Sequence, residues 1–340
     1  MKKVILIITF CILSFGCERS SELEVAVVIP PEESSANITV IPAVADYNEN
    51  NFDSVAFVLI EVDVTEDHFT IDESGTITEY RGPRGISLVI PSTINNTPVT
   101  AIGDGVFEGL DLNGVTIPDG VTHIGEFAFF HNNLSYVTIP DTVTSIGAVA
   151  FANNRLASLV IPDGIIRINI GTFRENHLHS VIIPDSVTQI GTDAFRSNQL
   201  TSVTIPDGVT FMGEAAFADN LLTSINIPRG DTAITLWGFT SNMLSSVFIP
   251  DTITHIWEGA FWGNQLISIV IPDSVRSINP DAFGSNPLTT ITIGANVRIG
   301  ICSLFFDSRP AFVNGFEDFY NTNGQMAGTY VFIDGQWSMK

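Results

Sequence analysis

The chain has 340 residues, of which 45% are hydrophobic and 15% charged, with 37 acidic residues against 14 basic ones. This apolar content supplies a sizeable core and excludes a chain that is disordered throughout. The formal net charge of −23 argues against a protein held on DNA, RNA or an anionic lipid surface, because phosphate contacts need clustered lysine and arginine. The three cysteines cannot form a disulfide framework, so stability must come from packing.

The first seventeen residues have the features of an export signal. A positive start at Lys2 and Lys3 precedes an apolar run that is shorter than the roughly 20 residues needed to span a bilayer. The run ends at Gly16-Cys17, which resembles a bacterial lipobox, although Ser14 stands where leucine is usual. We predict a signal peptide over residues 1–16 and lipidation of Cys17. The alternative is a plain secretory signal in which the cysteine is incidental.

Residues 17–51 are predicted to form an acidic tether. Proline, serine and acidic residues are frequent in this segment, and Arg19 is its one basic residue. Such a segment repels itself and stays extended, which would hold the folded part away from a membrane. Residues 52–90 are predicted to form an N-terminal cap.

From residue 107 onward the sequence repeats with a period of 22. The unit reads L-x-x-V-x-I-P-D-x-V-T-x-I-G-x-x-A-F-x-x-N-x. Residues two apart, such as Val137 and Ile139, point to the same side of a strand, and Pro140-Asp141 then ends that strand with a turn. Phenylalanine recurs in register at Phe107, Phe129, Phe151, Phe173, Phe195, Phe217, Phe239, Phe261, Phe283 and Phe305.

Neighbouring coils must stack, because no single coil can bury its own apolar side chains. The period therefore predicts a mainly β solenoid of about ten 22-residue coils over residues 91–310, with parallel strands and short helical turns. An asparagine follows most of the phenylalanines by three positions, from Asn132 to Asn286. A buried amide needs hydrogen-bond partners, so we predict an asparagine ladder bonded to itself and to the turn backbone.

The period, the I-P turn and the A-F-x-x-N segment resemble the BspA-type leucine-rich repeats of bacterial surface proteins, which also occur in treponemal leucine-rich repeat proteins. The resemblance extends upstream to residue 69, through a first coil that is five residues longer than the others. It implies a right-handed leucine-rich repeat solenoid that is capped at both ends. It also implies an exported or surface-attached protein that has no enzymatic site and binds proteins of hosts or other cells.

The pattern stops after Phe305, and residues 311–340 are rich in aromatic side chains. Asp334-Gly335 between two apolar runs predicts a two-residue hairpin turn, after a short helix near Phe316 to Tyr320. We interpret residues 311–340 as an aromatic C-terminal cap over the open end of the stack. Carbohydrate binding by these aromatic residues is the alternative.

The repeats contain few sequence features that indicate an enzymatic or metal-binding site. Parallel β-helix enzymes that cleave acidic polysaccharides have a similar period, but no coil between Ile102 and Phe305 carries the insertion that would wall a cleft. An aspartate follows most of the turn prolines, and we expect it to cap its own turn, with a bridging calcium ion as the alternative. The histidines form no continuous column, and no metal-binding or phosphate-binding motif is present.

The outward side of the first strand is the predicted binding surface. Its columns, seven and nine residues after each phenylalanine, contain small, hydroxyl and apolar side chains without any charge. Exposed apolar area commonly marks an interaction site, although high β-propensity would also explain these residue types. The candidate binding residues are Tyr136, Val160, His179, Ile182, Phe248, Ile267 and Val270.

We therefore predict a non-enzymatic binding or adhesion protein that is exported to the bacterial cell envelope and exposed at its surface. Its partner would be an extracellular, host or other-cell protein, with a polysaccharide as the alternative. The membrane would be contacted only through the lipid on Cys17, and neither nucleic acid nor a cofactor is expected. The competing interpretations are a structural envelope component and a polysaccharide-active parallel β-helix enzyme.

Overall fold

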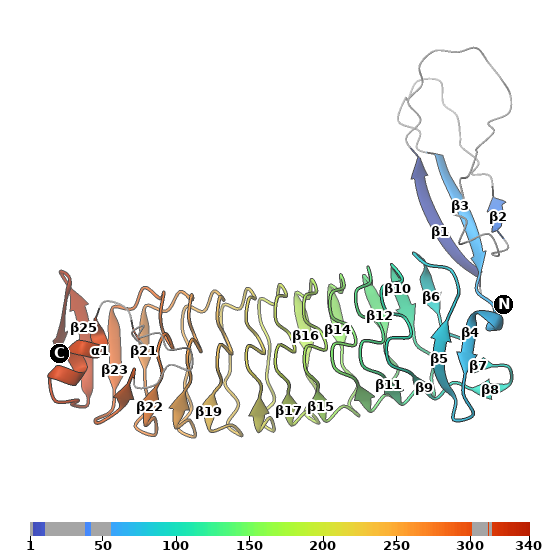
Figure 1. Ribbon diagram of the computed structural model, residues 1–340. Coiled ribbons are helices and arrows are strands. Elements are labelled where there is room, and N and C mark those ends of the chain that lie inside the picture. Colours follow the sequence, from blue (N-terminus) through green and yellow to red (C-terminus); the bar gives the residue numbers. More distant parts are fainter. Residues whose placement is uncertain (1–2, 11–37, 42–55, 301–311, 313–314) are drawn as a thin grey trace, which may run out of the picture.

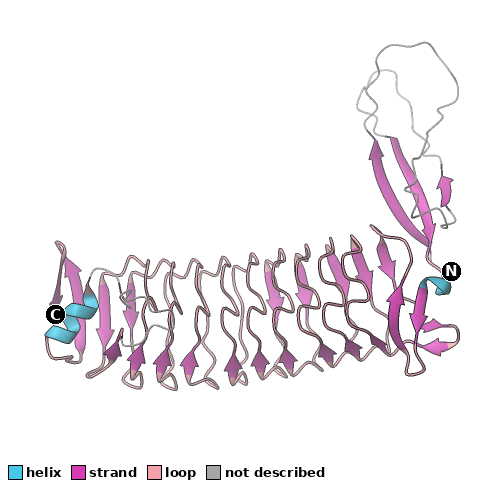
Figure 2. Ribbon diagram, in the orientation of Figure 1, coloured by secondary structure: helices cyan, strands magenta, loops and turns pink. Residues whose placement is uncertain are grey.

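Each 22-residue coil runs through two short strand segments joined by turns, and the coils stack into a long rod (Figure 1). The computed structural model describes residues 3–10, 38–41, 56–300, 312 and 315–340. Strands gather along two edges of the rod, and turns and loops make up the rest of each coil (Figure 2). The mainly β solenoid predicted from the 22-residue period is confirmed.

In the coils that form a first strand, this strand pairs in parallel with that of a neighbouring coil, as Val160 does with Ile182, 22 residues away. These ladders are short because the proline of the I-P turn has no N–H: the isoleucine before it still pairs, as the Ile117 N–H does with the Thr138 carbonyl (3.1 Å), and the ladder ends there. Their members are β6 (Ser87–Val89), β10 (Gly114–Thr116), β12 (Tyr136–Thr138), β14 (Ser158–Val160), β16 (Ser180–Ile182), β21 (Ser268–Val270) and β23 (Thr290–Ile293).

The first-strand column is interrupted in the middle of the rod. Across described residues 201–250 only the isolated bridge between Asn226 and Phe248 continues it. The Asn226 side chain accepts a hydrogen bond from the Ile205 N–H (3.0 Å) and donates one to the Ile205 carbonyl (2.7 Å). This side chain therefore satisfies backbone groups that a ladder would otherwise pair, as short polar side chains can do.

The second strands form the opposite column. They are β9 (Ala101–Ile102), β11 (His123–Ile124), β13 (Ser145–Ile146), β15 (Arg167–Ile168), β17 (Gln189–Ile190), β18 (Phe211–Met212), β19 (Ala233–Ile234), β20 (His255–Ile256), β22 (Ser277–Ile278) and β24 (Arg298–Ile299). Gly147 follows one of these strands, and a Cβ there would lie 2.4 Å from the Glu126 backbone nitrogen of the preceding coil. The glycine at this position therefore allows close approach between these coils, whereas Asn169, Thr235, Trp257 and Asn279 hold the equivalent position in other coils.

The phenylalanine column forms the centre of the rod. From Phe107 to Phe283 the rings are fully or almost fully buried and stack nearly parallel, with centroids 5.1 to 6.0 Å apart. The column continues into Tyr80 at one end and Phe312 at the other. Phe305, the tenth predicted member, lies outside the described residues.

The asparagines after this column are buried, as predicted, but they bond to the backbone and not to one another. The Asn198 Nδ2 donates to the carbonyls of Phe195 (3.1 Å) in its own coil and Phe173 (2.9 Å) in the preceding coil. Its Oδ1 accepts from the Leu178 N–H (3.1 Å). The same pattern recurs from Asn132 to Asn286, so each amide ties two coils together.

The aspartates of the I-P-D turns do not cap their turns, which corrects the expectation from the sequence. In the turn at Pro140 the backbone itself makes the closing bond, from the Val143 N–H to the Pro140 carbonyl (3.0 Å). Asp141 and its equivalents in the other coils are exposed, and the described residues place no hydrogen-bond donor on their carboxylates. The turn geometry is therefore satisfied without them, and the aspartates supply surface charge.

Antiparallel elements lie at the N-terminal end of the rod. The η2 turn (Glu66–His68) leads into β4 (Phe69–Ile71), which pairs with β5 (Thr76–Tyr80) against the first coil. The extra residues of that coil form a hairpin of β7 (Thr93–Ile94) and β8 (Thr97–Pro98). A separate sheet consists of β1 (Lys3–Phe10), β3 (Ala56–Asp63) and β2 (Ile38–Ile41). Removal of the predicted signal peptide would leave only β2 and β3 of this sheet.

The C-terminal end of the rod is covered by helix α1 (Phe316–Thr322) and by a hairpin of β25 (Gly328–Ile333) and β26 (Gln336–Met339), which extends the sheet from β23. Phe316, Tyr320, Tyr330 and Trp337 are buried against one another. Their burial leaves them no exposed ring face for a sugar, so they close the end of the hydrophobic stack.

Candidate binding surfaces

The first-strand face, defined as the outward side chains of the first-strand column, carries two apolar patches. The first consists of Val160 and Ile182, whose side chains are 70% and 68% exposed and lie opposite each other in the β14–β16 ladder. The residues between the outward positions, such as Leu159, point into the core and are buried. The alternation of a strand therefore holds these two apolar side chains in water.

The second apolar patch consists of Phe248, Ile267 and Val270, which are between 60% and 69% exposed. Phe248 and Val270 line a depression of about 510 Å³, and Arg229 and Asp251 also contribute to its lining. Asn226, which interrupts the strand ladder, lies on the same column between the two patches. The two patches therefore belong to separate short ladders and not to one continuous sheet.

The other two predicted residues also lie on this face. Tyr136 is 46% exposed, and its ring covers Gly114 of the preceding coil, where a Cβ would come within 2.2 Å of the ring. His179 is exposed beside the first patch, one residue before β16. All seven candidate binding residues within the repeats are thus accessible, whereas Cys17 lies outside the described residues.

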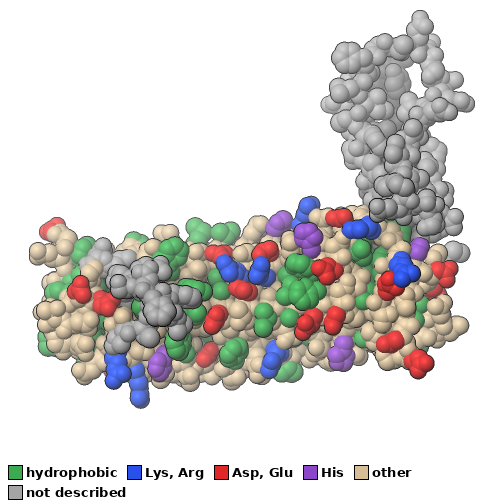
Figure 3. Space-filling model, in the orientation of Figure 1, with side chains coloured by type: hydrophobic (Ala, Val, Ile, Leu, Met, Phe, Trp, Pro, Cys, Tyr) green, Lys and Arg blue, Asp and Glu red, His purple; other side chains and the backbone are tan. Residues whose placement is uncertain are grey.

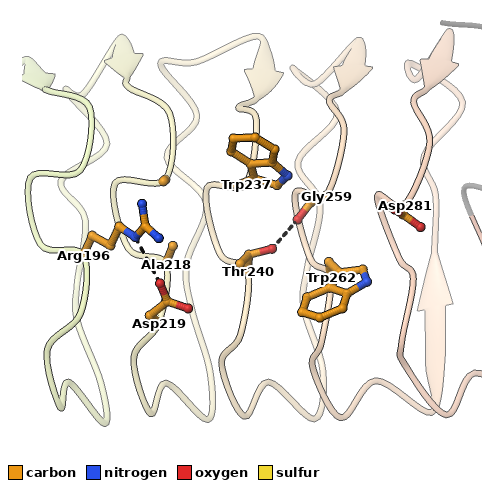
Figure 4. A pocket seen from close by; sticks show the side chains of 9 residues that line it. Arg196, Ala218, Asp219, Trp237, Thr240, Gly259, Trp262 and Asp281 are labelled. Atoms are coloured by element: carbon orange, nitrogen blue, oxygen red, sulfur yellow. Dashed lines mark hydrogen bonds and ion pairs between the residues drawn. The ribbon is translucent and has the colours of Figure 1, made fainter. Parts of the chain in front are cut away.

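A second site, which we call the tryptophan groove, is formed by turn residues that come shortly before and shortly after the buried phenylalanines in the chain. It has a volume of about 360 Å³ and crosses several coils (Figure 4). Two indoles from neighbouring coils form its walls, Trp237 two residues before Phe239 and Trp262 one residue after Phe261. Ala215, Ala218 and Gly259 contribute only small side chains or none to its lining.

Charged groups lie at both ends of the tryptophan groove. At one end the Arg196 Nε donates to the Asp219 Oδ2 (3.0 Å; Figure 4). The Arg196 Nη1 also lies 3.4 Å from the Asp193 Oδ1. Partial burial lowers the pKa of the Arg196 guanidinium. The hydrogen bonds and charge attraction from Asp219 and Asp193 have the larger combined effect, so this pKa is raised. Asp281 lines the other end. Figure 3 shows that acidic and basic side chains are otherwise sparse and scattered along the face of the rod in that view.

The tryptophan groove was not predicted from the sequence. Neither Trp237 nor Trp262 is among the binding residues predicted from the sequence. The available signal was the presence of three tryptophans, Trp237, Trp257 and Trp262, within a short stretch and outside the core columns. Large aromatic side chains at non-core positions of a repeat are expected at the surface, because the repeated apolar residues already occupy the core.

Metal-binding clusters and membrane-spanning helices are absent from the described residues. In the part of the chain that the structure describes, no cluster of three or more histidine, cysteine, aspartate or glutamate side chains is placed to hold a metal ion. Among the same residues, no helix has the length and hydropathy that crossing a membrane requires.

Comparison with known proteins identifies the family. The family model described as BspA type leucine rich repeat region, with six copies, matches residues 100–221 and 189–309, which together make up more than half of the chain. The chain therefore belongs to the BspA-type leucine-rich repeat family. No curated protein matches it.

Several solved structures of bacterial proteins are similar to it. A leucine rich cell surface protein from Faecalibacterium prausnitzii is 26% identical over 67% of this chain and 87% of that one, with a TM-score of 0.39. A leucine-rich repeat protein from Bacteroides ovatus is 21% identical over 77% of this chain and 64% of that one, with a TM-score of 0.46. The leucine rich repeat protein of T. pallidum is 21% identical over 54% and 83%, with a TM-score of 0.31.

Proposed function

We propose that this protein is a non-enzymatic binding protein of the bacterial cell surface, which captures a partner protein through its first-strand face. The observation that carries the proposal is the exposure of four large apolar side chains, Val160, Ile182, Phe248 and Val270, on columns without any charge. In a chain with a net charge of −23, uncharged columns of this length form a distinct surface. Membership of the BspA-type family supports a binding role in preference to catalysis.

The physical basis is the release of water from apolar surface. Burying one of these side chains in an interface would contribute about 1.5 to 3 kcal/mol, part of which is offset by the cost of association. Because the strands are rigid, little conformational entropy is lost on binding. A protein partner with its own apolar patch and hydroxyl-bonding groups would therefore match this face best.

We expect the double substitution Val160→Glu with Phe248→Glu to abolish partner capture without unfolding the rod. Both side chains are about 70% exposed, so new charges there cost little in the free protein but would be desolvated in an interface. Capture is measured with the mature chain, residues 17–340, immobilised against a panel of purified extracellular proteins and polysaccharides, and melting curves are recorded in parallel.

The matched control is Ile166→Glu with Ile170→Glu, which adds the same charge at exposed apolar positions outside the first-strand face. We expect the control to retain capture. Retained capture by the Val160 and Phe248 variant would place the site in the turns or the caps and refute the proposal. Capture of polysaccharides but of no protein would mean that the partner is a polysaccharide and not a protein.

We also propose that Cys17 anchors the protein in a membrane through a lipid, because a short apolar run ends in Gly16-Cys17. Mass spectrometry of the native protein should find a lipid-modified N-terminus at Cys17, and Cys17→Ser should move the protein from the membrane fraction to the soluble fraction. An unmodified N-terminus at any other residue would contradict the lipid anchor but leave the binding proposal intact.

A further inference from the structure

The tryptophan groove is built by glycines as well as by tryptophans. A Cβ at Gly259 would lie 2.2 Å from the Trp237 Cδ1, and a Cβ at Gly284 would lie 2.8 Å from the Trp262 Cδ1. Each indole therefore rests against a glycine of the following coil, which limits its movement. The two rings come from neighbouring coils and remain 36% and 38% exposed (Figure 4). The groove thus presents two preorganised aromatic surfaces to solvent.

Trp237 lies in the left-handed region of the backbone, with a φ of 53°. The same conformation recurs at the equivalent position of the other described coils, where glycines such as Gly105 alternate with other residues that include Phe127 and Val149. The left-handed turn is therefore a feature of the repeat, and it places the side chain of this position at the surface of the coil.

The charges of the groove favour a cationic ligand. The one cation that lines it, Arg196, is already neutralised by Asp193 and Asp219, and Asp219 is still 38% exposed. Asp281, which is largely buried (9% exposed), adds another carboxylate to the lining, and the whole chain carries a net charge of −23. An anionic ligand would be repelled, whereas a cation over the indole faces would gain both cation–π attraction and carboxylate attraction.

We infer that the tryptophan groove binds an arginine side chain from a basic segment of a partner protein. Arginine fits because its planar guanidinium stacks on an aromatic face while its edge donates hydrogen bonds to a carboxylate such as Asp219. This inference deepens the proposed function by giving the charge class of the partner, and it rests on that function only in taking the partner to be a protein. The groove and the first-strand face use different columns of the repeat.

The test uses synthetic peptides and so does not require the natural partner. A fluorescein-labelled glycine-serine peptide with three arginines is titrated with mature protein and followed by fluorescence anisotropy. The comparison peptide carries citrulline, a neutral isostere, at the three arginine positions. We expect the arginine peptide to bind at least about tenfold more tightly than the citrulline peptide, and its affinity to fall as salt is raised.

Three variants test whether the arginine peptide binds in the groove or is attracted only by the negative charge of the whole protein. Trp237→Leu with Trp262→Leu keeps every charge and should weaken arginine-peptide binding about tenfold. Trp257→Leu removes an equally exposed indole (39%) that does not line the groove and should have no effect. Asp219→Asn should weaken binding and reduce its salt dependence.

The inference is overturned if the citrulline peptide binds as well as the arginine peptide, or if the tryptophan double variant binds like the wild type. Binding of a neutral oligosaccharide, with maltohexaose as the probe, without any preference for arginine would make the groove a sugar platform and also overturn it. The Val160→Glu with Phe248→Glu variant should bind the arginine peptide normally, so failure of the groove and failure of the first-strand face are distinguishable.

Discussion

Phe195→Ala is expected to lower the free energy of unfolding by about 3 to 5 kcal/mol, the usual loss when a buried aromatic ring is removed. Phe195 is fully buried, and its ring is stacked between Phe173 and Phe217 at centroid distances of 5.6 and 5.3 Å. Those neighbours are held in place by the backbone bonds of their own coils, so the cavity should not collapse. Denaturant midpoints measured by circular dichroism test this prediction.

The control is Phe211→Ala, since Phe211 is 54% exposed on the second-strand column. Its midpoint should change by no more than a typical surface substitution changes it, within about 0.5 kcal/mol. If Phe195→Ala and Phe211→Ala shift the midpoint equally, the phenylalanine column is not the stabilising core of the rod.

Asn198→Ala should cost about 2 to 4 kcal/mol, because it leaves several buried backbone groups without a partner. The lost groups are the Leu178 N–H and the carbonyls of Phe173 and Phe195, which all bond to the Asn198 amide. Each unsatisfied buried group carries its own desolvation penalty. The same unfolding measurement applies, with no change expected in the folded far-ultraviolet spectrum.

Asn133→Ala provides the matched control, because Asn133 is only partly buried and its one side-chain hydrogen bond, to Asp111, is 3.5 Å long. We expect a change of less than about 0.5 kcal/mol. An Asn198→Ala variant as stable as the Asn133→Ala variant would mean that the buried amides do not hold the coils together.

The repeat made the core predictable because it places equivalent residues in equivalent surroundings. A single period of 22 predicted the burial of every described phenylalanine in the column from Phe107 to Phe283 and the burial of the asparagines that follow them. The same reasoning could not find the end of the column. The ring that follows Phe283 is Phe312, which comes from a segment that no longer follows the period.

Features specific to one coil were harder to predict, since a period carries no information about them. The Asn226 amide pairs with both backbone groups of Ile205, although its column elsewhere holds threonine or apolar residues. The two indoles of the tryptophan groove occur in only two coils. Neighbouring coils supply the small residues beside them, Gly259 and Gly284, so the site depends on residues about 22 positions apart.

Photo-crosslinking directly tests whether the protein binds its partner through the first-strand face. p-Benzoyl-phenylalanine is placed at Ile182, which is 68% exposed on that face, and separately at Ile166, which is 55% exposed elsewhere on the rod. With a partner captured from the panel of extracellular proteins, we expect a crosslink from position 182 and none from position 166. A crosslink from position 166 with none from position 182 would contradict it.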